Sequence, residues 1–353
     1  MILHAINSLG VGGAEVYVVG LACRMKRKGE DVEVLVLDGG RSHLTDKLER
    51  EGIRIRRAPR VGLLCPIHFF VFLRMLLSGR YDVVHTHLTY AQLWAAAASL
   101  FNFRGVRLYT SEHSTTNRRR GKRVLRLVDR FIFWRHKEVF CISEETRRSL
   151  TGWLGVADGR KYRVVPNCVD IDRFREAEPL DRGVLGLDGK DKIVMMVGRM
   201  TAAKNQQTVI EAVEMLPNDY KCVLVGDGET FDDVAKAITV PGKTIMTGQR
   251  SDIAELMKMC DIYVHSSHWE GMPTSVLESM AAGKVVFGSD VDGIRSLVPE
   301  GQLFENGNAG QLKHMIESLT PQREQEITDA QNDIVSKYSL SAITDTILSA
   351  YKA

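Results

Sequence analysis

The stretch from Ser266 to Gly283, SSHWEGMPTSVLESMAAG, constrains the fold of this chain more than any other. The apolar residues 262–264 in front of it predict a short buried strand, and TSVLESMAAG behind the glycine turn predicts a helix. Ser275 is the expected N-cap of that helix, with Glu278 at the capping-box position, and Gly283 suits its C′ position. A strand, a glycine turn and a helix in this order leave free amides at the helix start, which can bind an anion.

Two carboxylates of this stretch, Glu270 and Glu278, are separated by seven residues. Taken alone, they can be a loop carboxylate and a helix cap and nothing more. Their pattern, E-G-x-P-x-x-x-x-E, resembles the E-x7-E motif of the retaining glycosyltransferase family 4. The resemblance implies an α/β protein of the GT-B fold, in which two Rossmann-like, doubly wound domains face each other across a cleft.

The length of 353 residues is sufficient for two domains. We expect an N-terminal, acceptor-binding domain over residues 1–169 and a C-terminal, donor-binding domain over 170–336 that begins with a charged linker. The resemblance implies that a terminal helix, about 337–353, crosses back to the first domain. The six cysteines are scattered, as is typical of reduced thiols in a cytosolic protein, and we find neither a signal peptide nor a membrane-spanning apolar run.

The net charge of +3 hides an asymmetry between the two halves. Residues 1–168 contain 29 Lys and Arg against 15 Asp and Glu, a surplus of +14, whereas the remaining 18 against 29 give −11. A basic half can face nucleic acid or an anionic membrane. Since the chain has no zinc-finger spacing, no RNP-type aromatic motif and no helix-turn-helix pattern, we expect no nucleic-acid partner.

A glycine-rich loop, Gly10-Val11-Gly12-Gly13, follows the first predicted strand and precedes a predicted helix. This unit is typical of the start of a doubly wound domain, although the loop departs from the dinucleotide fingerprint G-x-G-x-x-G, so an NAD-dependent dehydrogenase is a distant alternative. The loop can be only a tight turn. Family 4 enzymes have a similar G-G-A-E here, which implies that Gly12 and Gly13 lie against the transferred sugar and phosphate.

Three histidines lie at the ends of two predicted strands in the first half. His85 and His87 end a central strand, where the crevice of an open α/β sheet lies. They can be metal ligands, but no third ligand is evident in the sequence, and we interpret them as residues that line the cleft. His113 follows the next strand, and the resemblance implies a functional histidine at this position, next to hydroxyls of the sugar.

A basic segment, residues 117–137, predicts a helix with two faces. Its arginines recur at i, i+3 and i, i+4 spacings, and an apolar arc from Val124 to Trp134 lies beside them. The segment can be an ordinary surface helix. We favour a contact with lipid headgroups or a polyanionic acceptor, and we assign to it, together with His87, the residues Arg119, Arg123, Arg126 and Arg130.

In the second half, Arg199 and Lys204 flank the turn between a predicted strand and a helix from about Asn205. Two cations at a helix start can hold a diphosphate. They also match the family pattern G-R-x-x-x-x-K-N, in which they hold the donor's diphosphate. The family receives the nucleobase at the position of Gln249 and Arg250. PNCVD, which ends the first half, resembles the family's P-N-G-V-D, with Cys168 in place of its glycine.

The function implied by the resemblance is transfer of a sugar, with retention, from a nucleoside-diphosphate sugar to a hydroxyl of a lipid-linked or polysaccharide acceptor. We expect a UDP-sugar as the donor, no cofactor and no metal, and an enzyme peripheral to the inner face of the cytoplasmic membrane. The predicted catalytic residues are His113, Glu270, Arg199 and Lys204. The predicted donor-binding residues are Gly12, Gly13, Gly198, Arg199, Lys204, Asn205, Gln249, Arg250, Glu270, Gly271, Met272, Pro273, Thr274, Ser275 and Glu278.

Two alternatives remain open from the sequence. One is a GT-B phosphorylase or sugar-phosphate synthase, which uses phosphate or a phosphorylated sugar as acceptor. The other is a catalytically silent protein that binds sugar nucleotides or assists polysaccharide assembly.

Overall fold

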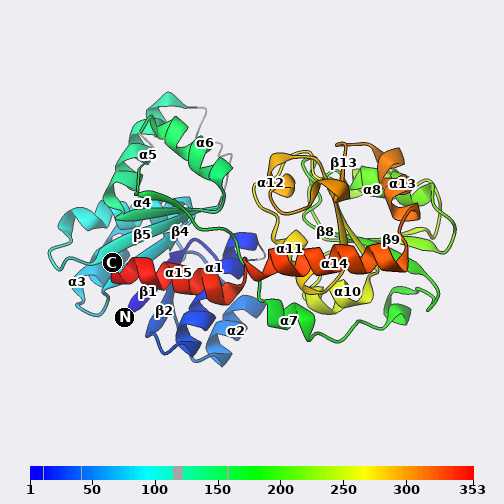
Figure 1. Ribbon diagram of the computed structural model, residues 1–353. Coiled ribbons are helices and arrows are strands. Elements are labelled where there is room, and N and C mark those ends of the chain that lie inside the picture. Colours follow the sequence, from blue (N-terminus) through cyan, green and yellow to red (C-terminus); the bar gives the residue numbers. More distant parts are fainter. Residues whose placement is uncertain (11, 41, 114–121, 157–158) are drawn as a thin grey trace. The chain divides into compact units, whose positions relative to one another are not determined.

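The computed structural model describes residues 1–10, 12–40, 42–113, 122–156 and 159–353. The chain divides into two compact units (Figure 1). The first contains Met1–Asn167 together with Leu340–Ala353, and the second contains Cys168–Ser339. The boundary lies two residues before the position expected from the sequence, and the returning segment begins at residue 340.

The first unit is built on a seven-stranded sheet whose neighbouring strands are all parallel. The strand order is β3-β2-β1-β4-β5-β6-β7, so the direction of winding reverses between β1 and β4, the position at which open α/β sheets bind ligands. β3 lies at one edge of this sheet. The strands are β1 (Ile2–Ile6), β2 (Val32–Val36), β3 (Arg54–Arg57), β4 (Val83–His87), β5 (Arg107–Glu112), β6 (Glu138–Cys141) and β7 (Tyr162–Val164).

Helices cover both faces of this sheet, so the central strands β1, β2 and β4 are buried along their whole length. On one face α1 packs against α2 and against α15, the last helix of the chain, and on the other α4 packs against α3 and α5 (Figure 1). The helices are α1 (Gly13–Arg27), α2 (His43–Arg50), α3 (Ile67–Leu77), α4 (Thr89–Ala98), η1 (Ser99–Phe101), α5 (Arg123–Arg135), α6 (Glu144–Leu154) and α15 (Leu340–Lys352).

The second unit repeats this design with a six-stranded parallel sheet in the order β10-β9-β8-β11-β12-β13. Its winding reverses between β8 and β11. The strands are β8 (Lys192–Val197), β9 (Tyr220–Val225), β10 (Thr244–Met246), β11 (Ile262–His265), β12 (Val285–Ser289) and β13 (Leu303–Phe304). The helices are α7 (Ile171–Arg175), η3 (Arg182–Leu185), α8 (Gln206–Glu214), α9 (Phe231–Lys236), α10 (Ile253–Met259), α11 (Thr274–Ala281), α12 (Asp292–Arg295), η4 (Glu300–Gln302), α13 (Ala309–Glu317) and α14 (Pro321–Ser336).

The core of the second unit lies between this sheet and helices α8 and α13. Alternate residues of β8, β9, β11 and β12 enter it, including Val194, Leu224, Val264 and Phe287. Successive strand side chains point to opposite faces of the sheet, and the polar residues Ser266 and Ser267 follow β11 at its carboxyl end. β11 pairs with β8 in parallel, so the carboxyl ends of these two strands lie next to each other.

Candidate functional site

The loop after β8 carries both cations that the sequence analysis assigned to a diphosphate. It closes with a bond from the Lys204 amide to the Thr201 carbonyl, 2.9 Å, and ends at Asn205, which has a positive φ of 49° and begins α8. Ser266, just after β11, donates its hydroxyl to the Asn205 carbonyl at 2.8 Å. The Arg199 side chain is exposed and that of Lys204 is mostly buried. The loop therefore holds both cations at the carboxyl ends of β8 and β11.

Glu270 is the partner of Lys204. The two side chains form an ion pair, and each is only 20% exposed. His265 lies 3.4 Å from the same carboxylate oxygen, and the Ser267 hydroxyl donates to it at 3.4 Å. Burial by itself raises the pKa of Glu270, but the hydrogen bond from His265 and the charge of Lys204 outweigh it and hold that pKa at about 2. Glu270 is thus a carboxylate at neutral pH, able to accept hydrogen bonds from hydroxyls.

His265 is a site residue that the sequence analysis missed. It is fully buried, and its two ring nitrogens lie 3.1 Å from the Tyr263 hydroxyl and 3.4 Å from Lys204 Nζ. Burial and the charge of Lys204 lower its pKa. The available signal was a histidine at the end of a buried strand, the same pattern that singled out His85 and His87.

The start of α11 differs from the prediction. The helix begins at Thr274 with Pro273 as its N-cap, without a side-chain cap, so the assignment of Ser275 as N-cap is wrong. The fixed φ of Pro273, −74°, suits the entry to a helix, and the Ser275 side chain bonds to the hydroxyl of Tyr263. Gly283 is confirmed at C′, with φ +74° and its amide bonded to the Met280 carbonyl at 3.0 Å. Thr274 and Ser275, with Gly271 and Met272 before them, therefore form the turn and first residues of this helix.

Glu278, the second carboxylate of the motif, has a raised pKa, whereas the pKa of Glu270 is lowered. Burial raises its pKa to about 7, and only the charge of Arg173 opposes this shift. In the folded protein the proton is retained to a pH at which an unfolded glutamate has already lost it. The carboxyl group therefore destabilises the fold progressively as pH rises from about 4.5 to about 7, and the full cost applies above that range.

We expect the variant Glu278→Gln to gain melting temperature relative to the parent as pH rises from 4.5 to 8. The corresponding gain in the free energy of unfolding is on the order of 3 kcal/mol at pH 8 and close to zero at pH 4.5. Thermal unfolding at a series of pH values measures it, with the exposed Glu300 changed to Gln as control. A difference that stays constant with pH would contradict the burial of this carboxyl group.

Close backbone packing supports the Glu270 loop from behind. A Cβ on Gly293 in α12 would lie 2.2 Å from the Glu270 carbonyl oxygen and 2.7 Å from that of Gly271. Likewise, a Cβ on Gly226 would lie 2.0 Å from the carbonyl oxygen of Gly198. Only glycine permits both approaches, so these two residues belong to the site although neither touches it with a side chain.

We expect Gly293→Ala to displace the Glu270 loop, because the atoms that it would meet are backbone and cannot rotate away. Overpacking of this kind costs about 1–3 kcal/mol, and activity should fall by about tenfold or more. The matched control is Gly310→Ala in α13, whose added Cβ would meet nothing closer than 3.6 Å and should stabilise the helix slightly. Thermal unfolding and activity of both variants decide the matter, and normal activity in Gly293→Ala would contradict this role.

Gln249 and Arg250 follow β10 in the second unit. Gly248, with φ +66°, turns the chain there, and its carbonyl accepts from the Gly226 amide at 2.9 Å. The Arg250 guanidinium is paired with Asp252, whereas Gln249 is exposed. Backbone groups and Gln249 are thus the accessible polar groups of this turn.

In the first unit, Gly12 is the N-cap of α1, and its carbonyl accepts from Val16 at 3.1 Å. A Cβ on Gly12 would lie 2.4 Å from the Glu15 carboxylate, whereas one on Gly13 would meet nothing within 4 Å. The atom that a Cβ on Gly12 would meet is the end of a flexible side chain, so packing does not require glycine there, and Gly13 leaves open space beside the helix start. Val11 lies outside the described residues.

Four histidines of the first unit, His4, His85, His87 and His113, form a cluster, and the sequence analysis missed His4. His4 on β1 lies opposite His85 on β4, and possible ligand atoms of His4, His85 and His87 all lie within 4.8 Å of one another. His4 supplies the third histidine that was not evident from the sequence, because only the sheet brings β1 beside β4. His113 joins the cluster through His87, with ring nitrogens 3.3 Å apart.

The basic segment is described only in part. Arg119 lies outside the described residues, and so does the side chain of Arg123. Arg126 lies beside the C-terminal end of α6, where its Nη2 is 2.0 Å from the position of a Cβ on Gly155. Carbonyls at a helix C-terminus attract a cation, so Arg126 packs onto α6, whereas Arg130 is exposed.

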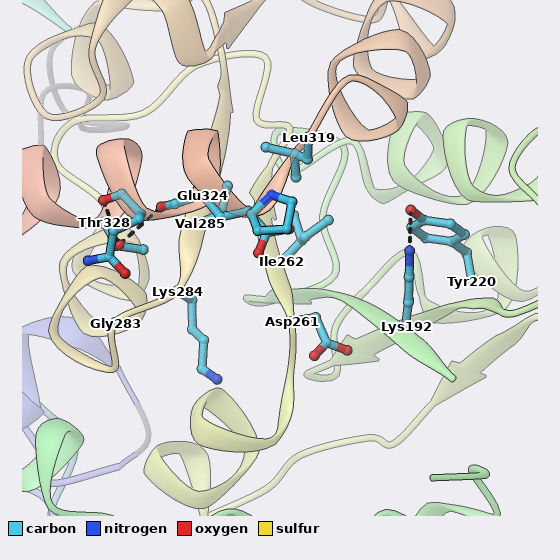
Figure 2. A pocket seen from close by; sticks show the side chains of 12 residues that line it. Lys192, Tyr220, Asp261, Ile262, Gly283, Lys284, Val285, Leu319, Glu324 and Thr328 are labelled. Carbon is cyan, nitrogen blue, oxygen red and sulfur yellow. Dashed lines mark hydrogen bonds between the residues drawn. The ribbon is translucent and has the colours of Figure 1, made fainter. Parts of the chain in front are cut away.

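A cavity of about 480 Å³ in the second unit lies at the other end of the sheet (Figure 2). It adjoins the amino ends of β8, β9, β11 and β12, away from the cations and carboxylates described above. Its lining residues are Lys192, Tyr220, Asp261, Ile262, Gly283, Lys284, Val285, Leu319, Pro321, Glu324, Gln325 and Thr328. We assign it no part in the candidate site.

The matches to known families cover both units. The model of Glycosyltransferase Family 4 matches residues 11–173, and that of Glycosyl transferases group 1 matches residues 178–332. The chain is 27% identical over 301 residues to the Escherichia coli UDP-Gal:alpha-D-GlcNAc-diphosphoundecaprenol alpha-1,3-galactosyltransferase, covering 79% of this chain and 77% of that protein. It is 33% identical over 147 residues to the Campylobacter jejuni N,N'-diacetylbacillosaminyl-diphospho-undecaprenol alpha-1,3-N-acetylgalactosaminyltransferase, covering 40% and 39%.

Solved structures agree on the fold. Anabaena HepE in complex with UDP and glucose superposes with a TM-score of 0.84 at 22% identity, covering 100% of this chain and 99% of that one. Sucrose-phosphate synthase from Thermosynechococcus elongatus superposes with a TM-score of 0.78 at 18% identity, covering 99% and 98%. The fold is therefore GT-B. The chain belongs to glycosyltransferase family 4, and it is a transferase.

Proposed function

We propose that this protein moves a sugar from a UDP-sugar to a hydroxyl of a lipid-linked or polysaccharide acceptor, with retention at the anomeric carbon. The observation that carries the proposal is the group formed by Lys204, Glu270 and His265 beside the exposed Arg199. The relatives named above use lipid-linked sugars by their names, and HepE was solved with UDP.

The chemistry follows from the charges in the second unit. The bond from the anomeric carbon to the diphosphate breaks, and negative charge develops on the leaving phosphate oxygen. Arg199 and Lys204 stabilise this charge, helped by the amides at the start of α11. A new bond forms between the anomeric carbon and the acceptor oxygen, and the acceptor's proton passes to the leaving phosphate. Glu270 holds sugar hydroxyls, and Glu278 holds the ribose diol. No metal is required in this scheme.

Ligand screening followed by product analysis tests the function. A UDP-sugar at 100 times its Kd should stabilise the protein by about 2.7 kcal/mol, which a thermal-shift measurement detects. The stabilising donor is then incubated with a polyprenyl-diphosphate sugar, with and without EDTA. We expect transfer in both samples and an unchanged anomeric configuration by NMR. Inversion would refute retention, activity that needs added magnesium or manganese would refute metal independence, and binding without transfer to any acceptor would favour a silent binding protein.

The alternative of a sugar-phosphate synthase is supported by one observation, because sucrose-phosphate synthase shares the fold. Such an enzyme transfers to a phosphorylated sugar instead of a lipid-linked one. Adding sugar phosphates or free phosphate as the acceptor distinguishes the two, and turnover only with these would replace the lipid-linked acceptor in our proposal.

We further propose that the first unit docks on an anionic membrane, at the inner face of the cytoplasmic membrane. Helix α3 buries only His68, Phe72 and Leu76 of its apolar residues and histidine, and its Phe70 is 63% exposed. The ring of Phe69 lies 5.2 Å from that of Phe70 and 6.0 Å from that of Phe101 on η1, so the exposed apolar side chains of both elements form one patch.

The charges around this patch complement an anionic surface. Five arginines but no lysine or glutamate occur from residue 60 to residue 107, and the single acid, Asp82, pairs with the N-terminal amine at 2.5 Å. Arg135 of α5 bonds to Ser99 of η1, and the exposed Trp134 beside it extends the patch. Within the described residues no helix is both long and apolar enough to span a bilayer. Apolar insertion combined with basic residues gives reversible binding.

Phe103 follows η1, with its amide bonded to the Phe101 carbonyl at 3.0 Å, and is 83% exposed. We expect the double variant Phe70→Ser, Phe103→Ser to bind anionic vesicles about 30-fold more weakly, because each phenyl group contributes about 1 kcal/mol when partly inserted. The matched control is Met215→Ser, Val240→Ser, which removes two exposed apolar side chains from the second unit. Co-sedimentation at low and high salt, with anionic and neutral vesicles, measures the effect. Equal binding of parent and variant, or no binding by the parent, would exclude this surface.

A further inference from the structure

A row of hydrogen-bonded groups runs through the first unit from Met25 on α1 to His113 at the end of β5. His4 Nε2 lies 3.4 Å from the sulfur of Met25, and His4 Nδ1 lies 3.1 Å from His87 Nε2. His87 Nδ1 in turn lies 3.3 Å from His113 Nε2. Met25, His4 and His87 are fully or almost fully buried, so water does not compete for these bonds.

The row has a direction because its first member cannot donate. The Met25 thioether carries no proton and is only a weak acceptor, so the proton of the first bond must be on His4 Nε2. Burial keeps the three rings neutral, since it lowers the pKa values of His4 and His113 to about 4 and that of His87 well below its usual value. A neutral imidazole has one N–H, so a ring that donates on one side must accept on the other.

The directions of the remaining bonds follow in sequence. His4 donates to Met25, so its Nδ1 accepts from His87 Nε2–H. His87 has then used its one proton, so its Nδ1 accepts from His113 Nε2–H. The reverse direction would place a ring lone pair against the sulfur lone pairs of Met25 in a buried site, and it would leave the His4–Met25 contact without a proton.

We propose that Met25 and His4, acting through His87, fix His113 in the tautomer with its proton on Nε2 and a lone pair on Nδ1. His113 is then a hydrogen-bond acceptor for a substrate hydroxyl, of the transferred sugar or of the acceptor, a role that rests on the proposed glycosyl transfer. Met25, His4 and His87 do not touch the substrate in this scheme and are positioning residues.

His85 lies in the same cluster but outside the row, and it provides an internal reference. Its two ring nitrogens face the hydroxyls of Tyr351 and Ser111, the latter at 2.9 Å. A hydroxyl can donate or accept, so neither partner dictates the tautomer of His85. Because every ring nitrogen of His4, His85 and His87 already has a hydrogen-bond partner, we interpret the cluster as a set of hydrogen-bonded side chains and not as a metal site.

NMR of the full chain with ¹⁵N-labelled histidine tests the tautomers directly, without any substrate. We expect His4, His87 and His113 all to carry the proton on Nε2. In Met25→Leu, which keeps the volume but removes the acceptor, the row loses its fixed end, and the opposite tautomer of His113 should become populated, whereas His85 stays unchanged. The proposal would be overturned if His113 carried its proton on Nδ1 in the parent, or if the tautomer of His113 were unchanged in Met25→Leu.

A second variant and a kinetic measurement complete the test. His4→Phe removes the acceptor for His87 and should release His113 in the same way. In Met25→Leu, turnover should fall by about tenfold while UDP affinity is unchanged, as expected for the loss of one hydrogen bond to substrate. The control Met257→Leu, in the other unit, should alter neither. If the parent shows the expected tautomers but transfers no sugar, the proposed function fails while the tautomer assignment stands. Altered turnover with unaltered tautomers would overturn the positioning role.

Discussion

Replacing Lys204 with alanine is expected to lower kcat/KM for the sugar donor by about 10² or more and to weaken UDP binding. The lysine is mostly buried, it is bonded through the backbone to its own loop, and it lies where a diphosphate can reach both it and the start of α8. A charge held in a partly dry site stabilises a developing negative charge without reorganisation. Arg199→Ala should act in the same direction, with a smaller effect on the ground state because this side chain is exposed.

The control is Lys236→Ala, since this exposed lysine lies on α9 and pairs with the equally exposed Asp233 three residues away. Donor kinetics and UDP titrations of the three variants give the comparison. Loss of activity in the control would indicate a general effect of surface charge. Full activity in both Lys204→Ala and Arg199→Ala would contradict the assignment of the diphosphate site to this loop.

Glu270→Gln is expected to lower kcat by about 10² while leaving UDP affinity unchanged or higher. The carboxylate holds its negative charge to a pKa of about 2, and in the absence of ligand it neutralises Lys204. Without that charge the lysine attracts a diphosphate more strongly, whereas the hydroxyls of the sugar lose their acceptor. The affinity for a UDP-sugar should therefore fall relative to that for UDP.

Calorimetry with UDP and with the UDP-sugar separates these effects, because a nucleotide-only contact would change both affinities together. The double variant Lys204→Ala, Glu270→Gln should be less impaired than the two single effects combined, since the two side chains interact directly. Additive effects would show that the ion pair does not connect them, and parallel losses for UDP and UDP-sugar would place Glu270 at the nucleotide instead of the sugar.

The alternation of strands and helices was readable from the chain because both sheets are parallel and buried on both faces. Strands such as β8 and β11 are largely apolar runs, and helices such as α8 bury an apolar stripe. The edge strand β3 differs, because it is not an apolar run and its four residues are exposed or half-buried. Patterns within a short segment predict such elements, because the apolar residues of the segment itself decide which of its faces is buried.

The start of α11 shows where local reasoning failed. Ser275 and Glu278 have the spacing of a capping box, yet the N-cap is Pro273, two residues earlier, and the Ser275 side chain bonds to the hydroxyl of Tyr263. A partner on a neighbouring strand is invisible to a motif defined by spacing along the chain. Gly293 was missed for the same reason, because the carbonyl of Glu270 lies against it only after β12 has paired beside β11.

The sequence by itself determined the two doubly wound units, the positions of Arg199, Lys204 and Glu270 at strand ends, and the family, because these depend on periodicity and on residue types within short segments. Only the tertiary structure decided which side chains meet. It placed His265 beside the ion pair of Lys204 and Glu270, turned Arg126 onto α6, and brought His4 from β1 beside His87 of β4 and next to Met25 of α1. These contacts join residues from separate elements, and their geometry is set by strand order and packing, which no local pattern encodes.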